Sequence, residues 1–201
     1  TSKDVRWFEI EPCYFVHSAN AYESDGRVVL EAPRYPVFMQ AGKPDILAQE
    51  VDSELHRWSF DLASGHVHEE CLSDRPIEFP RINELLTGRK HDVSYAVTGT
   101  GSGPRIAIEG LLKHDSRLGV SQVHDMPDGR VPSEAIFVPA RDGRAEDEGW
   151  LLSFVFDPGR DASDLVIIDA TRFADAPQAV VQLPARVPFG FHGTWVPAGA
   201  R

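Results

Sequence analysis

The chain consists of short apolar or alternating runs that are separated by clusters of Gly, Pro, Asp and Ser. Runs rich in Val, Ile, Phe, Tyr and Trp, with turn signals between them, are typical of β-strands. No segment of more than a turn or two has the periodicity of an amphipathic helix. We therefore expect an all-β protein with strands near residues 6–10, 13–17, 27–32, 55–62, 66–70, 75–83, 91–98, 105–109, 111–115, 120–124, 133–139, 150–157 and 165–169.

A strand that closes on an aspartate, followed by a turn and another strand, recurs at Asp61, Asp115 and Asp157, at intervals of 54 and 42 residues. The blades of a β-propeller repeat every ~40–50 residues, so the spacing is close to that of a propeller, while a sandwich or a barrel stays an alternative. On that period the chain holds about four blades' worth of strands. The nearly all-apolar run 150–157 is expected to be buried on both faces.

The composition is that of an ordinary globular protein, with 42% hydrophobic and 25% charged residues. The net charge of −11 argues against nucleic acid as a partner, because nucleic-acid binding depends mainly on phosphate neutralisation. The apolar runs are far shorter than the ~20 residues of a membrane span, and no signal peptide is visible. Cys13 and Cys71 form no CxxC pair, which favours two free thiols in a reducing cytoplasm over a disulfide.

Two histidines are candidate metal ligands. His192 lies between Gly190 and Gly193, and glycine permits unusual φ values and a close approach of the backbone to another group. His17 is expected at the end of a strand, just before a connection, where functional side chains are commonly held by a rigid scaffold. Each imidazole is either a metal ligand or a packed structural residue.

Two glutamates interrupt apolar runs. Glu78 lies between Ile77 and Phe79, and Glu134 stands at the start of an apolar strand. A carboxylate in the position of Glu78 is either exposed by alternation or buried and paired, because unpaired burial is unfavourable. A second polar pattern, on one face of the strand near 66–70, is either a metal site or a solvated face. The solvated face is favoured, because its residue types are mostly exposed in proteins; they are His66, His68 and Glu70.

Several motifs, spread over essentially the whole chain, resemble the carotenoid cleavage oxygenase family. They follow the family's order and correspond to the C-terminal part of a longer family member. The resemblance implies a seven-bladed β-propeller. Residues 1–201 would form about its C-terminal half, as a portion of a single propeller domain that is incomplete on the N-terminal side. The matching segments are residues 7–17 with Asn20-Ala21-Tyr22, then 78–83, 131–139, 146–169 and 188–195.

The resemblance also implies a metal centre. Family members hold a non-haem Fe(II) on the propeller axis with four histidines and no carboxylate. The family's His-x-x-Asn-Ala-Tyr motif points to His17 and its Gly-Phe-His-Gly motif to His192, while the other two ligands would lie upstream of residue 1. Family glutamates that accept the outer N–H of a ligand imidazole fall on Glu78 and Glu134. This is chemically consistent, because imidazole suits iron and a buried carboxylate fixes the tautomer and orientation of the ring.

Six further histidines match no ligand motif, and we expect them to be surface or structural residues: His56, His66, His68, His91, His114 and His124. Beyond the metal centre, no catalytic residue is expected. Phe15, Phe189 and Phe191 are candidate walls of a substrate tunnel, with core packing as the equal alternative.

The reaction implied by the resemblance is insertion of both atoms of O₂ across an alkene C=C, giving two carbonyl products. Family substrates are carotenoids, apocarotenoids or lignostilbene-like phenolic alkenes. One branch of the family isomerises retinoid esters, and nothing in the sequence favours that activity. A cytoplasmic location is expected, and peripheral membrane contact of the full-length protein stays open.

The alternative is a metal-free propeller that serves in binding or scaffolding, with both motif histidines structural. A hydrolase is disfavoured, because neither Gly-x-Ser-x-Gly nor His-Glu-x-x-His is present. The chain starts at Thr1 without a Met and is expected to be cut from a longer protein. The isolated 201 residues are expected neither to bind iron tightly nor to turn over, because two ligands make a weak site and an unclosed propeller exposes sheet edges.

Overall fold

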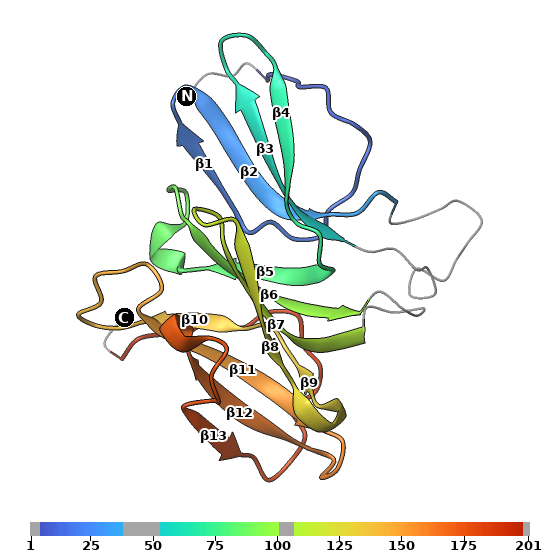
Figure 1. Ribbon diagram of the computed structural model, residues 1–201, viewed down its shortest axis with the longest axis vertical. Helices are drawn as coiled ribbons and strands as arrows, with labels where there is room; N and C mark the ends of the chain where they lie inside the picture. The colour runs from blue at the N-terminus through green and yellow to red at the C-terminus, as the bar shows by residue number, and fades with distance from the viewer. Residues whose placement is uncertain (1–4, 38–52, 101–106, 199–201) are drawn as a thin grey trace.

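A computed structural model describes residues 5–37, 53–100 and 107–198. Within these ranges the protein is all-β, as the sequence pattern predicts, with thirteen strands and three short 3₁₀ helices (Figure 1). In chain order they are β1 (Asn20–Ser24), β2 (Arg27–Arg34), β3 (Glu54–Asp61), β4 (Val67–Ser73), β5 (Ile77–Ile82), η2 (Glu84–Leu86), β6 (Val93–Thr100), β7 (Ala107–Asp115), β8 (Val120–Asp125), η3 (Pro127–Gly129), β9 (Val131–Pro132), β10 (Ile136–Pro139), β11 (Gly149–Asp157), β12 (Ala162–Asp169), η4 (Ala170–Arg172) and β13 (Ala179–Gln182).

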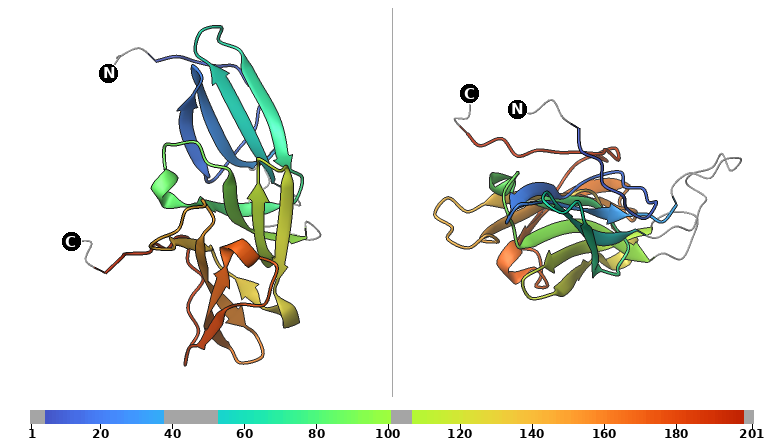
Figure 2. Two further views of the ribbon diagram at one scale, coloured as in Figure 1. Left: turned by 60° about the vertical axis from the view of Figure 1, so that its left-hand side comes forward. Right: turned by 90° about the horizontal axis from the view of Figure 1, so that it is seen from above.

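The strands form three antiparallel sheets that follow the order of the chain. The first runs β1-β2-β3-β4, the second β5-β6-β7-β8 and the third β10-β11-β12-β13, with β9 paired to β11. The sheets succeed one another along the long axis of the molecule, from the first in blue and cyan to the third in orange and red (Figures 1 and 2). Because β5 contacts both β2 and β10, the first strand of the middle sheet lies against both neighbouring sheets.

The described residues therefore hold three blade-like sheets, and the expectation of about four was wrong. Segments 6–10 and 13–17, which we expected to be strands, belong to no ladder there; Tyr14 alone forms an isolated bridge, with Tyr35. Trp7 is 91% exposed. A β-favouring run becomes a strand only where it pairs with a sheet edge, and neither segment pairs with an edge of the three described sheets. As a result His17 lies in an irregular segment before β1, not at the end of a strand.

The recurring aspartates mark one repeated turn. Each of them is the last residue in the first strand of a hairpin. Its Oδ1 accepts backbone N–H groups from the turn that follows, which forms an Asx-type turn. The donors are Ala63 and Ser64 for Asp61 (2.9 and 2.7 Å), Arg117 and Leu118 for Asp115 (both 3.0 Å), and Gly159 for Asp157 (2.9 Å). Each turn then passes through a residue with positive φ: Gly65, Gly119 and Asp161. The spacing of the aspartates thus reports the hairpins β3–β4, β7–β8 and β11–β12.

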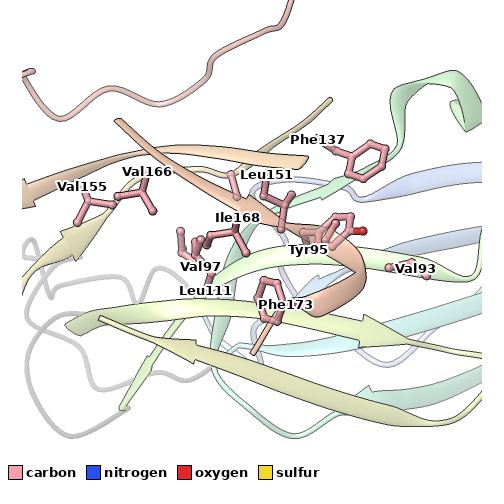
Figure 3. Close-up of a cluster of buried hydrophobic side chains, with 12 residues drawn as sticks. Val93, Tyr95, Val97, Leu111, Phe137, Leu151, Val155, Val166, Ile168 and Phe173 are labelled. Carbon is pink, nitrogen blue, oxygen red and sulfur yellow. The ribbon is translucent and has the colours of Figure 1, made fainter. Parts of the chain in front are cut away.

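The larger apolar core lies between the second and third sheets (Figure 3). Within it the ring of Tyr95 stacks on that of Phe137, with 5.6 Å between centroids and 9° between planes. A smaller cluster joins the first and second sheets through Leu55, Ile77, Ala96 and Leu112. Burial of apolar surface between successive sheets therefore fixes them against one another. The larger core consists of Val93, Tyr95, Val97, Leu111, Ala135, Phe137, Leu151, Val155, Val166, Ile168, Ala170 and Phe173.

Two strand expectations needed correction. The run 150–157 is buried on one face only: its residues alternate between buried and partly exposed, and Phe154 is 43% exposed, because the second sheet covers a single side of β11. Residues 107–109 and 111–115, which were expected in two separate strands, belong to one strand, β7. At Gly110 an added Cβ would lie 2.8 Å from the carbonyl oxygen of His124, so glycine lets the neighbouring strand approach there. The strand that was expected near 91–98 corresponds to β6, which extends to Thr100.

The acidic turn at residues 146–148 is more than a solvated loop. The Glu146 carboxylate accepts backbone hydrogen bonds from Asp92 and Val93, at 2.8–3.0 Å, where β6 begins. Asp147 lies 2.6 Å from Nζ of Lys113 on β7, which is buried and also donates to the carbonyl of Ala170 at 2.7 Å. These contacts tie the second sheet to the third, because a buried ammonium is stable only when paired.

A second polar network anchors the residues that follow His17. The Asn20 side chain donates to the Arg89 carbonyl (2.8 Å) and to Nδ1 of His91 (3.2 Å). The buried His91 donates in turn from Nε2 to the Glu31 carboxylate at 3.1 Å, and Arg57 donates to the same carboxylate at 2.8 Å. Burial by itself raises the pKa of Glu31, but the hydrogen bonds and charges of His91 and Arg57 outweigh it and hold that pKa below its ordinary value.

Within the described ranges, no helix has the length and hydropathy needed to span a bilayer. Cys13 and Cys71 are both free thiols, as expected, the first half-buried and the second exposed.

The Lys113–Asp147 pair predicts a stability effect. Asp147→Ala should lower the free energy of unfolding by about 2 kcal/mol, because it removes a charge-assisted hydrogen bond from a buried ammonium. The exposed Asp142→Ala is the matched control and should change stability by less than about 0.5 kcal/mol. Chemical denaturation measures both. The double variant Lys113→Met, Asp147→Ala should recover part of the lost stability. Equal loss of stability in Asp147→Ala and Asp142→Ala would contradict the pairing.

The Glu31 network predicts a pH dependence. Because the folded-state pKa of Glu31 lies below its ordinary value of 4.5, the network stabilises the fold above pH 4.5, and this contribution is lost as the pH falls through the lower folded-state pKa. The free energy of unfolding should therefore decrease on acidification below pH 4.5, and less steeply in Glu31→Gln. Denaturant titrations across this pH range measure both slopes, and parallel slopes would refute the assignment.

Candidate metal centre

His17 is held by Glu78 of β5. Its Nδ1 lies 2.7 Å from Glu78 Oε2, and Glu78 is 6% exposed. The other carboxylate oxygen accepts a hydrogen bond from Tyr35 Oη at 2.9 Å. Of the two alternatives for Glu78, the structure shows the buried and paired one. Burial first, and then the charge of Glu78, raise the pKa of Tyr35, so the phenol remains a donor at neutral pH.

Phe79 adopts a left-handed backbone conformation beside this contact, with φ of +51°. Such a φ is unfavourable for a bulky side chain and is found mostly at functional sites. It coincides with a bulge in the pairing of β5 with β6, and it lets the Phe79 N–H donate to Glu78 Oε2 at 2.6 Å. The Phe79 ring also packs against His17, with 4.9 Å between centroids, so the strained residue helps to fix both members of the pair.

His192 is held in the same way by Glu134, just before β10. Its Nδ1 lies 3.1 Å from Glu134 Oε1, while the N–H of Gly193 donates to Oε2 at 2.9 Å. Arg81 Nη1 adds a third contact to this carboxylate, at 3.3 Å. Glu134 is 7% exposed. The segment that carries His192 runs back from the outer end of the third sheet towards β10, in red in Figure 2.

The glycines beside His192 do not act as expected. Neither Gly190 nor Gly193 has a positive φ, and an added Cβ would meet no described atom closer than 3.5 Å. Gly193 instead contributes its backbone N–H to Glu134, which every residue except proline could do.

The structure brings His17 and His192 together, although 175 positions separate them in the sequence. Their ring centroids are 4.8 Å apart and their planes meet at 83°. In both rings the carboxylate engages Nδ1 and so places the proton there. Nε2 then carries no proton, and its lone pair is free to bind a metal ion. Within the described part of the chain, Nε2 of neither ring forms a hydrogen bond. Two neutral imidazoles at this distance, each oriented by a buried carboxylate, fit a shared first-row transition-metal ion.

A cavity of about 380 Å³ opens beside His192. Its walls are mostly aromatic and aliphatic, and Glu134, the single charged side chain that the described residues contribute to them, is already hydrogen-bonded by three donors. Phe189 and Phe191 line this cavity, whereas Phe15 does not: its ring lies 6.5 Å from that of Trp58. Further aromatic or aliphatic walls come from residues that the sequence alone did not suggest, among them Leu152, Phe154, Phe156 and Trp195.

The six remaining histidines lie away from this pair. His68 on β4 and His66, just before that strand, are both exposed, in agreement with a solvated face. The other four are buried: His56, His91, His114 and His124.

Three contacts of the site were missed from sequence: those of Tyr35, Phe79 and Arg81. Phe79 precedes a proline, a position that normally favours extended backbone, so nothing local indicates its left-handed φ. Tyr35 lies 43 positions before Glu78, and Arg81 lies 53 before Glu134, so only the folded chain joins them.

Comparison with known proteins agrees with this geometry. The family model RPE65, retinal pigment epithelial membrane protein, matches residues 1–197. The chain is 40% identical to the carotenoid cleavage oxygenase of Mycobacterium tuberculosis over 98% of its own length and 40% of that protein. It is 35% identical to carotenoid 9,10(9',10')-cleavage dioxygenase 1 of Arabidopsis thaliana, over 96% of this chain and 38% of that one. The chain thus spans about two fifths of the length of these relatives.

The crystal structure of cobalt-substituted Synechocystis apocarotenoid oxygenase superposes with a TM-score of 0.88 at 25% identity, over 97% of this chain and 42% of that one. That protein is a β-propeller, which confirms the expected fold class. With its matched residues extending over nearly the whole sequence, the chain belongs to the RPE65 and carotenoid cleavage oxygenase family.

Proposed function

We propose that this chain is part of a non-haem Fe(II) dioxygenase that cleaves a C=C bond of a carotenoid or apocarotenoid with O₂ and yields two carbonyl products. One observation carries the proposal: two histidines, each held by a buried glutamate, meet beside an apolar cavity. The relatives are named as carotenoid cleavage enzymes or as an apocarotenoid oxygenase, and these names support the same substrate class.

His17 and His192 would hold the iron through Nε2, together with ligands from outside this chain. When bound, the iron supplies the activation of O₂ that the closed-shell side chains of the site lack. Glu78 and Glu134 keep the Nδ1 protons in place, which leaves both Nε2 lone pairs free and orients the rings. Tyr35 and Arg81 each donate a further hydrogen bond to one of these carboxylates and so help to hold it against the imidazole.

The cavity beside His192 suits an apolar alkene. Its aromatic and aliphatic walls exclude water and give a polyene extensive dispersion contact. Because the Glu134 carboxylate is already satisfied by three hydrogen bonds, an uncharged substrate meets no unpaired charge from the described lining residues. A stilbene-like phenolic alkene is the second substrate class to compare. We further place the protein in the cytoplasm, where free thiols such as Cys71 persist.

Metal content tests the ligand assignment. The full-length protein, purified without oxygen, should contain one equivalent of iron that is lost in His192→Ala, because the imidazole donor is gone. His68→Ala is the matched control, an exposed histidine outside the site, and should keep its iron. Glu78→Gln should weaken iron binding about 10–100-fold, because the ring of His17 is then less firmly oriented. Elemental analysis and chelator competition measure these changes.

The same preparations test the reaction. Iron-loaded protein incubated with carotenoids, apocarotenoids and a stilbene should form aldehyde or ketone products with one oxygen atom from ¹⁸O₂ in each, and His192→Ala should form none. A protein that takes up no iron even after reconstitution with Fe(II) would refute the oxygenase assignment and favour a binding or scaffold propeller. Iron without cleavage of any of these alkenes would retain the metal centre and reject the proposed reaction.

A further inference from the structure

A second group of metal-binding side chains lies on the first sheet, in the hairpin β3–β4. Glu54 and His56 are two residues apart on β3, and Cys71 is the direct cross-strand partner of His56 on β4. One ligand atom from each of the three lies within 4.8 Å of the other two. Within the described residues, no other group of three such side chains comes this close.

His56 is oriented in the way that a metal-bound histidine usually is. Glu69, also on β4, lies 2.9 Å from Nδ1 of His56 and forms an ion pair with Arg34, whose Nε lies 2.8 Å from the same oxygen. A carboxylate on Nδ1 directs Nε2 towards the ligand position, as Glu78 and Glu134 do for the two histidines of the candidate metal centre. Nε2 of His56 then faces the Glu54 carboxylate, at 3.2 Å, with Cys71 Sγ 4.0 Å from the same oxygen.

A neutral His56 ring cannot satisfy both of its carboxylate contacts. A neutral imidazole has one N–H and cannot donate to both Glu54 and Glu69. The contact between Nε2 and Glu54 therefore requires either a second proton or a cation between the two groups. Cys71 adds a thiol at this position, which a proton on Nε2 does not require but a soft or borderline metal ion prefers.

The group is accessible from solvent. The Cys71 residue is exposed, and the side chain of Glu54 is 46% exposed, while that of His56 is 11% exposed. A shallow cavity of about 360 Å³, which Cys71 lines together with Ser73 and Asp74, opens next to it. A metal ion can thus reach the three ligand atoms without a change in the β3–β4 pairing.

We propose that Glu54, His56 and Cys71 form a binding site for a zinc-like divalent cation, separate from the histidine pair. Thiolate, imidazole and carboxylate are the ligands that Zn²⁺ takes in proteins, and three of them leave a fourth position for water. The thiolate and the carboxylate together neutralise the two charges of the ion. Binding replaces the proton of the Cys71 thiol, which is released to solvent. The pair His17 and His192 offers neither a thiolate nor a carboxylate ligand and so has no comparable preference for a zinc-like ion.

Cobalt(II) tests the proposal, because a thiolate ligand gives a sulfur-to-cobalt charge-transfer band that a histidine site lacks. Titration of the full-length protein with Co²⁺ should produce this band with an endpoint near one equivalent, and Zn²⁺ should displace it. Cys71→Ser should abolish the band, whereas Cys13→Ser, the matched free cysteine, should keep it. Glu69→Gln should weaken binding about 10–100-fold.

The variant pair His17→Ala and His192→Ala separates this site from the proposed function. The cobalt–thiolate band should persist in that double variant, so failure of one proposal leaves the other intact. If Cys71→Ser does not fold, alkylation of Cys71 in the unaltered protein, mapped by mass spectrometry, replaces it, and Zn²⁺ should slow that alkylation at least tenfold. Absence of the band from the unaltered protein, its persistence in Cys71→Ser, or alkylation that Zn²⁺ does not slow would overturn the proposal.

Discussion

The site depends on hydrogen bonds between buried carboxylates and imidazoles. Glu78 and Glu134 lie in or beside apolar strands, where an unpaired carboxylate would be strongly unfavourable. Each is satisfied by three donors, one of which is a histidine Nδ1. Since the glutamates belong to β5 and to the segment before β10, the interface between the sheets determines where the two imidazoles lie. The two rings meet because β5 and β10 contact each other.

The rest of the fold maintains this arrangement. Apolar side chains join the second sheet to the third, and the Lys113–Asp147 pair and the carboxylate of Glu146 reinforce the same boundary. On the other side, the buried Asn20–His91–Glu31 network fixes the start of β1, three residues after His17. Neither His17 nor His192 lies in a strand. Their positions are set by hydrogen bonds to residues of the rigid sheets, a common arrangement for functional side chains in loops.

A carboxylate on Nδ1 of a histidine occurs at three places in the described residues that bear on metal binding: Glu78 with His17, Glu134 with His192 and Glu69 with His56. The surroundings differ. His192 lines an apolar cavity and packs against His17, and no described anionic side chain contacts Nε2 of either ring, whereas the third ring faces Glu54 and Cys71 at the surface. The first environment suits a metal that keeps its charge for O₂, and the second suits a cation held by anionic ligands. One orienting device thus supports two chemically distinct candidate sites.

Much of the fold could be predicted from the sequence, because strands and turns depend on local chemistry. Alternating apolar runs gave most of the strands, and the aspartates at 61, 115 and 157 marked three hairpins, since an Asx turn needs only its own backbone. Motifs also singled out His17, His192, Glu78 and Glu134. Strand pairing was less accessible: residues 6–10 have strand composition but no partner among the described residues.

The sequence by itself determined which side chains are available for the site and that the chain is all-β. Tertiary structure decided which side chains meet. Tyr35 reaches Glu78, Arg81 reaches Glu134, and Cys71 faces His56 only because particular strands pair in a particular register. The left-handed φ of Phe79 likewise follows from a bulge against β6 and from packing on His17, both of which override the local preference before a proline. Local chemistry acts over a few residues, whereas a binding site is assembled from contacts between distant ones.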